Sequence, residues 1–92
     1  MNHFTTSSFW KLHDQLPDHI QQLAKKNYKL LKVDQKHPSL HFKKLSGGGK
    51  HQYCSARVGD HYRAICILDS DDAVWFWIGS HEAYNKLLKQ LR

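Results

Sequence analysis

The sequence contains little of what crosslinks a chain or anchors it in a membrane. Its 92 residues include only two cysteines, Cys54 and Cys66, and two prolines. Both cysteines lie in apolar segments without a CxxC spacing, so we predict two buried free thiols in a cytoplasmic protein. No run approaches the ~20 apolar residues of a membrane span. The opening MNHFTTSSFWKLHD has no basic stretch leading into an apolar run, so we expect no signal peptide.

Metal-binding patterns and acidic residues are also scarce. The eight histidines are scattered, and no pair has a ligand spacing such as HExxH, which argues against a structural zinc site. Fourteen lysines and arginines stand against eight aspartates and glutamates, for a net charge of +6. A basic excess of this size favours a polyanionic partner, which is RNA, DNA, the ribosome or an acidic protein.

The residues that are present predict an α+β fold in one domain, residues 1–92. Hydrophobic residues make up 40% of the chain and aromatic residues 12%, which suits a globular fold with a single core. Residues 3–6 can form a short first strand. A helix carrying Phe9 and Leu16 then follows, with Ser7 or Ser8 as its N-cap.

A second helix is expected from Pro17, which suits a first helical turn, to about Lys36, with Pro38 ending it. At 100° per residue its apolar side chains fall on one side. Its lysines fall on the other side, with no glutamate among them: Lys25, Lys26, Lys29, Lys32 and Lys36. This side is either an ordinary solvated surface or a surface for a polyanion, to which Lys25, Lys29 and Lys32 would bind.

The second half of the chain predicts a β-meander. Residues 39–45 alternate loosely and are expected to be extended, and SGGGK at 46–50 predicts a loop without the spacing of a phosphate-binding P-loop. Strands are predicted at 53–58, 61–68 and 73–78. Gly59-Asp60 and the segment 69–72 are short enough for hairpins, which gives an antiparallel order. Gly79 then closes the last strand, and Ser80 caps a C-terminal helix.

Arg63 is the most unusual residue of the predicted sheet. By alternation it shares a strand face with Ile65 and Ile67, where a charge needs a partner or an opening to solvent. One interpretation is an ion pair with one of the acids that follow: Asp69, Asp71 or Asp72. The other is a guanidinium fixed on a rigid strand to bind a phosphate at two points.

Three further residues could join Arg63 in one cleft. Arg57 ends the preceding strand and is either exposed at the strand end or converges with Arg63 across the hairpin. His81 and Tyr84 are three positions apart and share a helix face, just after the last strand. Arginine can stabilise charge on a phosphate and histidine can move a proton, so the set suits phosphodiester chemistry. Trp75 and Trp77 are expected on one strand face, for packing or for base stacking.

The segments LHFKKL, SARVGDHYRAI and WIGSHEAY resemble the RelE/ParE superfamily, the toxins of bacterial type II toxin–antitoxin systems. The resemblance covers about residues 1–88 and is strongest from Arg57 to Arg63, where members carry R-V-G-x-Y-R and this chain has one extra residue, His61. It implies a RelE-like α+β fold and an acidic antitoxin as partner. RelE-like members cut messenger RNA on the ribosome through attack of a 2′-hydroxyl, which implies an endoribonuclease without metal or other cofactor.

The same resemblance assigns roles to particular residues. Arg63 would stabilise the transition state, and His81 and Tyr84 would transfer protons or position the substrate. The residues expected to bind RNA phosphates are Arg57, Lys43, Lys44, Lys25, Lys29 and Lys32.

Two features of other members have no counterpart in this chain. The paired lysines before the signature arginine are missing, because that strand reads Tyr53-Cys54-Ser55-Ala56-Arg57. The glutamate base of another branch is also missing near Pro38, where His41 could substitute for it. Two alternatives to the ribonuclease therefore stand: a ParE-like inhibitor of DNA gyrase, which needs neither His81 nor Tyr84, and a degenerate member that only binds its antitoxin.

Overall fold

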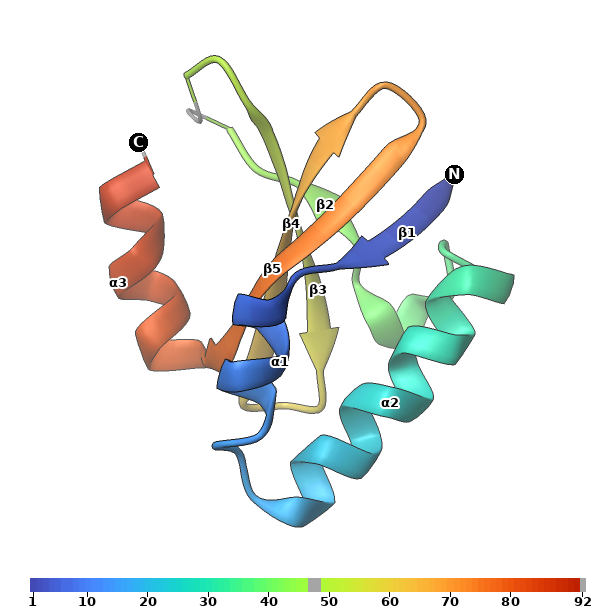
Figure 1. Cartoon of the computed structure of the whole chain (residues 1–92), viewed down its shortest axis with the longest axis vertical. Helices are drawn as coiled ribbons and strands as arrows, with labels where there is room; N and C mark the ends of the chain where they lie inside the picture. The colour runs from blue at the N-terminus through green and yellow to red at the C-terminus, as the bar shows by residue number, and fades with distance from the viewer. Residues whose placement is uncertain (47–48, 92) are drawn as a thin grey trace.

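The structure is a computed structural model that describes residues 1–46 and 49–91. Over these residues the chain forms three α-helices, a short 3-10 helix and one five-stranded sheet. The sheet is strongly twisted. Helices α1 (Ser7–His13) and α2 (Asp18–Val33) come from the first half of the chain, and α3 (His81–Leu91) comes from its C-terminal end (Figure 1). This confirms the predicted α+β class. No helix in the described part of the chain is both long enough and apolar enough to cross a bilayer.

The first half contains β1 (Asn2–Thr5), α1 (Ser7–His13) and α2 (Asp18–Val33). Thr6 caps α1 in place of Ser7 or Ser8, because its extended backbone lets its hydroxyl accept from the Phe9 N–H at 3.2 Å. Helix α1 ends before Leu16. Pro17 is the N-cap residue of α2 and stands outside its first turn.

The segment between α2 and the meander is less extended than its pattern predicts. Helix α2 ends at Val33, because Asp34 leaves helical geometry, so Pro38 is not what ends it. Pro38 instead opens the 3-10 helix η1 (Pro38–Leu40), and the left-handed His41 follows. Only Lys43–Lys44 then remain as strand β2. The SGGGK loop falls partly on residues 47–48, which lie outside the described residues.

The sheet has the order β1-β5-β4-β3-β2. The predicted meander is confirmed by β3 (Gln52–Val58), β4 (Tyr62–Asp69) and β5 (Asp72–Ser80), whose neighbours pair antiparallel. Gly79 lies inside β5 and does not close it. Strand β1 pairs parallel with β5 at one edge, and β2 pairs antiparallel with β3 at the other.

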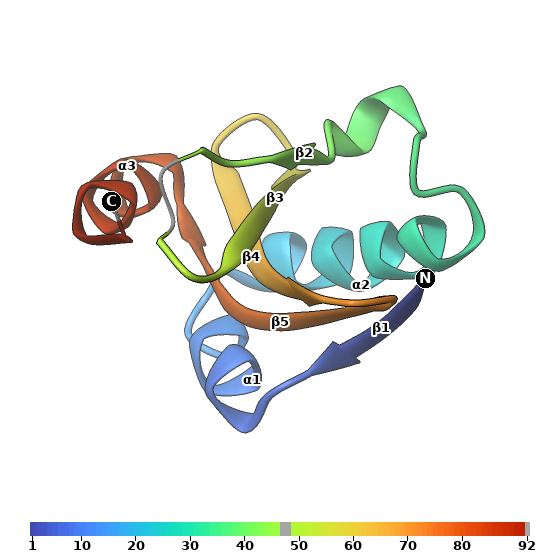
Figure 2. The ribbon, with the colours of Figure 1, turned by 90° about the horizontal axis from the view of Figure 1, so that it is seen from above.

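Helices cover the two faces of the sheet unequally. The face we call the core face packs against α1 and α2 in one cluster of buried side chains that includes Phe9, Ala24, Leu31, Ala64 and Ile78. The opposite face, which we call the α3 face, is covered by α3 (His81–Leu91). Figure 2 shows α2 and α3 on opposite sides of the curved sheet. On the α3 face, Ser55 and Ile65 are buried, whereas Arg63 and Trp77 are only partly buried.

A β-bulge separates the two tryptophans expected on one face. Cys66 pairs with Trp75, but the adjacent Ile65 pairs with Trp77, because β5 carries one extra residue at this point. Trp75 therefore points into the core face, where it is 2% exposed. Trp77 belongs to the α3 face beside the buried Ile65. A bulge of this kind cannot be recognised from the pattern of apolar residues in the sequence of the strand.

The two cysteines are buried free thiols, as predicted, and they are direct partners across β3 and β4. A hydrogen bond to Cys54 and burial raise the pKa of the Cys66 thiol. Cys66 therefore stays protonated and acts as a small apolar residue of the core.

His3 gives the fold a dependence on pH. The indole N–H of Trp75 can only donate, and it donates to His3 Nδ1 at 3.1 Å, so that nitrogen is unprotonated. Burial, and then the nearby N-terminal ammonium, lower the pKa of His3 from its ordinary 6.5. The unfolded chain therefore binds a proton that the folded chain resists. The stability that His3 contributes is complete above about pH 6.5 and is lost as the pH falls through the lower folded pKa.

We therefore expect the free energy of unfolding to fall more between pH 7.5 and 5.5 in the natural protein than in His3→Gln, whose amide does not titrate. Urea unfolding of both proteins at the two pH values measures this. Equal losses would show that other groups carry the acid sensitivity.

Candidate functional site

Arg57 and Arg63 lie side by side in the sheet. They are direct partners across the β3–β4 hairpin, and Arg63 also pairs with Gly79 of β5. Side chains of directly paired residues project from the same face. Ser55 and Ile65 form the next row of that face, and α3 covers that row because Ser55 contacts its Tyr84. The row of Arg57, Arg63 and Gly79 therefore belongs to the α3 face near the start of α3.

Arg63 is partly buried and uses one of its donors locally. Its Nη1 donates to the carbonyl oxygen of Tyr62 at 2.8 Å, which restrains the guanidinium beside the strand. Within residues 1–46 and 49–91, no acid lies within ion-pair distance of it. Asp69 and Asp72 are opposite residues of the strand ladder at the turn between β4 and β5. This turn lies about 20 Å from Arg63 along β4, at ~3.3 Å per residue. The ion-pair interpretation of Arg63 is therefore wrong for these acids.

Arg57 lies opposite Arg63, but its guanidinium contacts other groups. Its Nη2 lies 3.6 Å from Asp60 Oδ1 in the turn of the hairpin, which is longer than a good charged hydrogen bond. Its Nε is buried and has no hydrogen-bond partner among the described residues. A buried donor without a partner costs about 1–3 kcal/mol, so Arg57 is held in place at some expense of stability.

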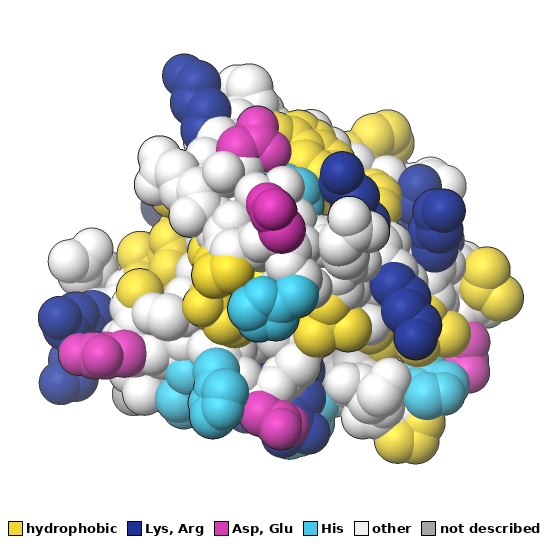
Figure 3. Space-filling view, turned by 90° about the horizontal axis from the view of Figure 1, so that it is seen from below, with side chains coloured by type: hydrophobic (Ala, Val, Ile, Leu, Met, Phe, Trp, Pro, Cys, Tyr) yellow, Lys and Arg dark blue, Asp and Glu magenta, His cyan; other side chains and the backbone are white. Residues whose placement is uncertain are grey.

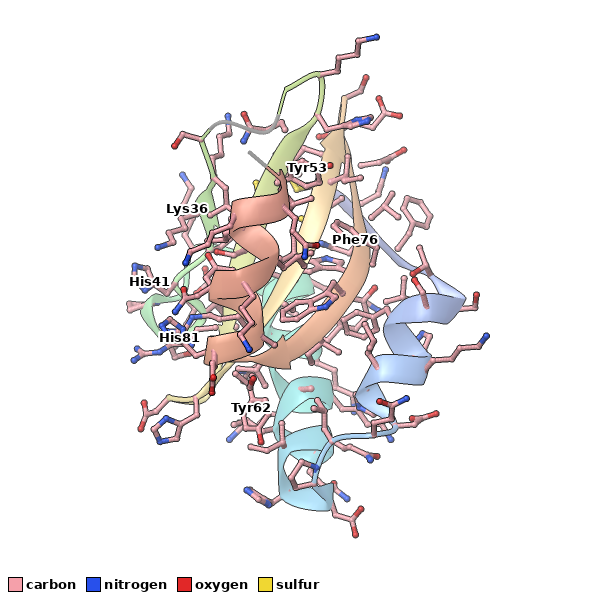
Figure 4. All side chains as sticks on the ribbon, turned by 90° about the vertical axis from the view of Figure 1, so that its left-hand side faces the viewer. Lys36, His41, Tyr53, Tyr62, Phe76 and His81 are labelled. Atoms are coloured by element: carbon pink, nitrogen blue, oxygen red, sulfur yellow. The ribbon has the colours of Figure 1, made fainter. Side chains whose placement is uncertain are left out.

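His81 and Tyr84 begin α3 on the face that carries the arginines. The His81 N–H donates to the His61 carbonyl at 2.7 Å, which ties the start of the helix to the turn before Arg63. Ser80 caps the helix as predicted, since its hydroxyl accepts from the Ala83 N–H at 3.1 Å. The His81 ring is exposed and stacks on Tyr84, with ring centroids 5.8 Å apart. In Figure 4, which looks onto α3, His81 lies at the foot of that helix.

Tyr84, which the resemblance assigns to proton transfer or substrate positioning, is a buried residue. It is 4% exposed, and its hydroxyl donates to Ser55 Oγ at 3.2 Å in a buried contact between α3 and β3. Tyr84 therefore anchors α3 to the sheet and supports the His81 ring. Ser55 was missed as a partner, although a small polar residue within the apolar run of β3 signals a buried hydrogen bond.

Glycine is required beside Arg63 because the Trp77 ring lies over position 79. A Cβ added to Gly79 would stand 2.7 Å from Trp77 Cζ2 and 2.8 Å from Cη2.

We expect Gly79→Ala to lower the free energy of unfolding by about 1–3 kcal/mol, as overpacking does, and to shift the Trp77 ring next to Arg63. Urea unfolding measures the loss, and the double variant with Trp77→Leu should recover most of it. An unchanged stability in Gly79→Ala would contradict the close packing.

The lysines expected to bind phosphates divide between two sides of the sheet. Lys43 pairs with Ser55 and so shares the α3 face, whereas Lys44 pairs with Cys54 on the other face. Lys25, Lys29 and Lys32 stand on α2 along a groove of about 270 Å³ that Phe9 and Trp10 also line. Figure 3 shows Lys and Arg side chains along the side of the molecule where α2 runs. The α2 lysines are therefore a separate surface from the row that holds Arg63.

The candidate site is thus an open, basic part of the α3 face. The structure brings five predicted residues to it: Arg57, Arg63, Lys43, His81 and Tyr84. A phosphate there would meet guanidinium donors and an exposed imidazole. In the described part of the chain, no three His, Cys, Asp or Glu side chains gather as a metal site.

Comparison with known proteins identifies the family of the chain. The ParE-like toxin domain family matches residues 18–86. None of the curated proteins matches the sequence.

Solved toxin structures share the fold at low sequence identity. The RelB–RelE antitoxin–toxin complex of Methanococcus jannaschii matches with a TM-score of 0.71 at 20% identity, over 91% of this chain and 96% of that one. The archaeal RelE–RelB complex of Pyrococcus horikoshii gives 0.66 at 18% identity, over 86% and 92%. A copper-bound mutant toxin of Helicobacter pylori gives 0.58 at 18% identity, over 90% and 97%.

The sequence match spans most of the chain, and the fold is that of the RelE structures. The chain belongs to the ParE-like toxin domain family of the RelE/ParE toxin superfamily.

Proposed function

We propose that this toxin is a ribosome-dependent endoribonuclease that cuts messenger RNA without a metal ion. The observation that carries the proposal is Arg63: a partly buried guanidinium on a central strand, without an acidic partner among the described residues, in the same face as an exposed histidine. A structural arginine in a sheet is expected to have a carboxylate partner. An arginine that must grip a phosphate is expected to keep its donors free.

The proposed reaction needs only RNA and side chains. The 2′-oxygen attacks the adjacent phosphorus and the 5′-oxygen leaves, so the products carry a 2′,3′-cyclic phosphate and a 5′-hydroxyl. Arg63 stabilises the charge that grows on the phosphate oxygens. His81 exchanges a proton with the attacking or the leaving oxygen. Tyr84 positions His81 by stacking under its ring, and Lys43 binds a phosphate of the strand.

The proposed partner in the resting cell is an acidic antitoxin. The M. jannaschii and P. horikoshii relatives are seen as RelB–RelE complexes, and the net charge of +6 here favours an acidic protein. The antitoxin would keep the toxin from the ribosome until it is removed.

Pulse labelling after induction of the toxin alone tests the proposal. Translation should stop first while DNA synthesis continues. A second candidate, inhibition of DNA gyrase, is favoured by the ParE-like description of the family match. An early halt of DNA synthesis with continuing translation would favour that candidate and refute the ribonuclease.

The α2 lysines are proposed to bind ribosomal RNA. Changing Lys25, Lys29 and Lys32 together to glutamine should weaken ribosome association and flatten its dependence on salt. The slope of log affinity against log salt should fall by about one unit for each lysine that binds a phosphate in the natural protein. Sedimentation with ribosomes at several salt concentrations measures the slope. A slope equal to that of the natural protein would make this side of α2 plain solvated surface.

A further inference from the structure

A second basic concavity lies at the edge of the sheet, between α2, η1 and the β3–β4 turn. It measures about 470 Å³, and its polar lining consists of Lys26, Asn27, His37, Ser39, Arg57 and Asp60. Only Arg57 of this set takes part in the site described above. The others come from segments far apart in sequence, which the fold brings to one place.

Arg57 offers the concavity donors that the protein does not use. Strand β2 pairs with β3 only at Cys54 and Ser55, so Arg57 lies beyond the covered part of that edge. Its carbonyl accepts from Asn27 Nδ2 at 3.2 Å, which fixes the backbone against α2. Its Nε has no partner among the described residues, and its Nη2 stands 3.6 Å from Asp60. Because Nε is buried, the donors that Arg57 can offer to a ligand are the Nη groups of its partly exposed guanidinium.

Contacts with Ser39 leave His37 with Nε2–H as its free hydrogen-bond donor. The Ser39 N–H, which can only donate, lies 3.2 Å from His37 Nδ1, and the Ser39 hydroxyl lies 2.8 Å from the same nitrogen. Nδ1 is therefore an acceptor, and the neutral ring carries its proton on Nε2. Nε2–H is the group that His37 can give to an anion.

The charges of the concavity favour an anion as well. Lys26 is exposed on α2 and has no acidic partner within the described residues. Lys26 and Arg57 carry two positive charges, and Asp60 supplies the only negative one among the lining residues. A planar guanidinium, an ammonium and an imidazole N–H suit the several oxygens of a phosphate.

We propose that this concavity binds a phosphate group, namely a backbone phosphate of the RNA strand whose cleaved phosphate lies at Arg63. The inference rests on the proposed function for the identity of the strand. Arg57 joins the two places, because it lines the concavity and pairs directly with Arg63. A free phosphate ion would use the same donors, so the experiment treats the two sources separately.

The test uses two variants, each of which replaces one of the groups proposed to bind the phosphate. Lys26→Gln removes a charge at the surface of α2. His37→Asn keeps a side-chain acceptor for the Ser39 N–H but lacks Nε2–H. Lys11→Gln is the matched control, because it removes an exposed charge from α1. Affinity for a 2′-O-methyl RNA hexamer, which cannot be cleaved, is measured by fluorescence anisotropy over a range of salt.

We expect Lys26→Gln and His37→Asn each to weaken hexamer binding about 3–10-fold, and Lys26→Gln to lower the salt slope by about 0.7, the value for one phosphate of a single strand. Lys11→Gln should bind the hexamer with an affinity within about twofold of that of the natural protein.

In a second arm, inorganic phosphate is titrated while the amide resonances of His37 and Arg57 are followed. Shifts with phosphate alone, at unchanged hexamer affinity in the variants, would assign the site to a free anion and overturn the RNA assignment.

No response to either ligand would overturn the phosphate site itself. Cleavage of ribosome-bound messenger by the natural protein is measured in parallel. If the protein does not cleave while the hexamer results hold, the nuclease proposal fails and the phosphate site stands. If it cleaves and both variants bind the hexamer normally, the assignment of the concavity to the RNA strand fails and the nuclease proposal stands.

Discussion

Replacing Arg63 with alanine should slow messenger cleavage by about 10²–10³-fold, which corresponds to about 2.7–4 kcal/mol of lost transition-state stabilisation. The physical reason is that the charge of a phosphoryl transition state is spread over several oxygens, which a guanidinium grips at two points. Arg63 has one donor committed to the Tyr62 carbonyl, so its orientation is set before the substrate binds. Single-turnover cleavage of ribosome-bound messenger measures the loss.

Arg63→Lys is the matched control for charge. A lysine keeps the positive charge but cannot grip the phosphate at two points, so it should recover little of the rate. A thermal melt accompanies each variant, and both should melt near the natural protein. Normal cleavage by Arg63→Ala, or a loss of activity that follows unfolding, would show that Arg63 serves the structure only.

Replacing His81 with glutamine should slow cleavage by about 10²–10⁴-fold, the range for loss of a group that transfers a proton. The side chain is exposed and its backbone N–H keeps the bond to the His61 carbonyl. The fold should therefore survive the change. Cleavage rates and a thermal melt of the same preparation measure both points.

Added imidazole separates a chemical role of His81 from a packing role. In His81→Ala, imidazole should restore part of the rate if the missing group moves a proton. His19→Gln is the control for histidine loss elsewhere, since His19 is exposed on α2. If imidazole does not restore the cleavage rate of His81→Ala and His81→Gln loses little of its rate, His81 serves only as the first residue of α3.

The meander could be predicted from sequence because its signals are local. Apolar runs separated by short turns place Arg57 opposite Arg63 once the hairpin is assumed, and the structure has that register. Ser80 could likewise be recognised as a cap, because a serine followed by an acid and an apolar stripe is a local helix-start pattern.

Other parts depend on interactions that no local pattern encodes. Strand β1 pairs parallel with β5 across almost the whole chain. The bulge that separates Trp75 from Trp77 is one extra residue in an otherwise regular strand. The Tyr84–Ser55 hydrogen bond joins positions 29 residues apart. The concavity of Lys26, His37 and Arg57 likewise depends on how α2 and η1 pack against an edge of the sheet.

The most direct test of the central claim is the chemistry of the RNA ends. Purified toxin is added to ribosomes that hold a defined messenger, and the products are analysed for their termini. We expect cleavage that yields a 2′,3′-cyclic phosphate and a 5′-hydroxyl, and no cleavage when the scissile nucleotide carries 2′-deoxyribose. Intact messenger together with inhibited gyrase supercoiling, or products that carry a 5′-phosphate, would contradict the account.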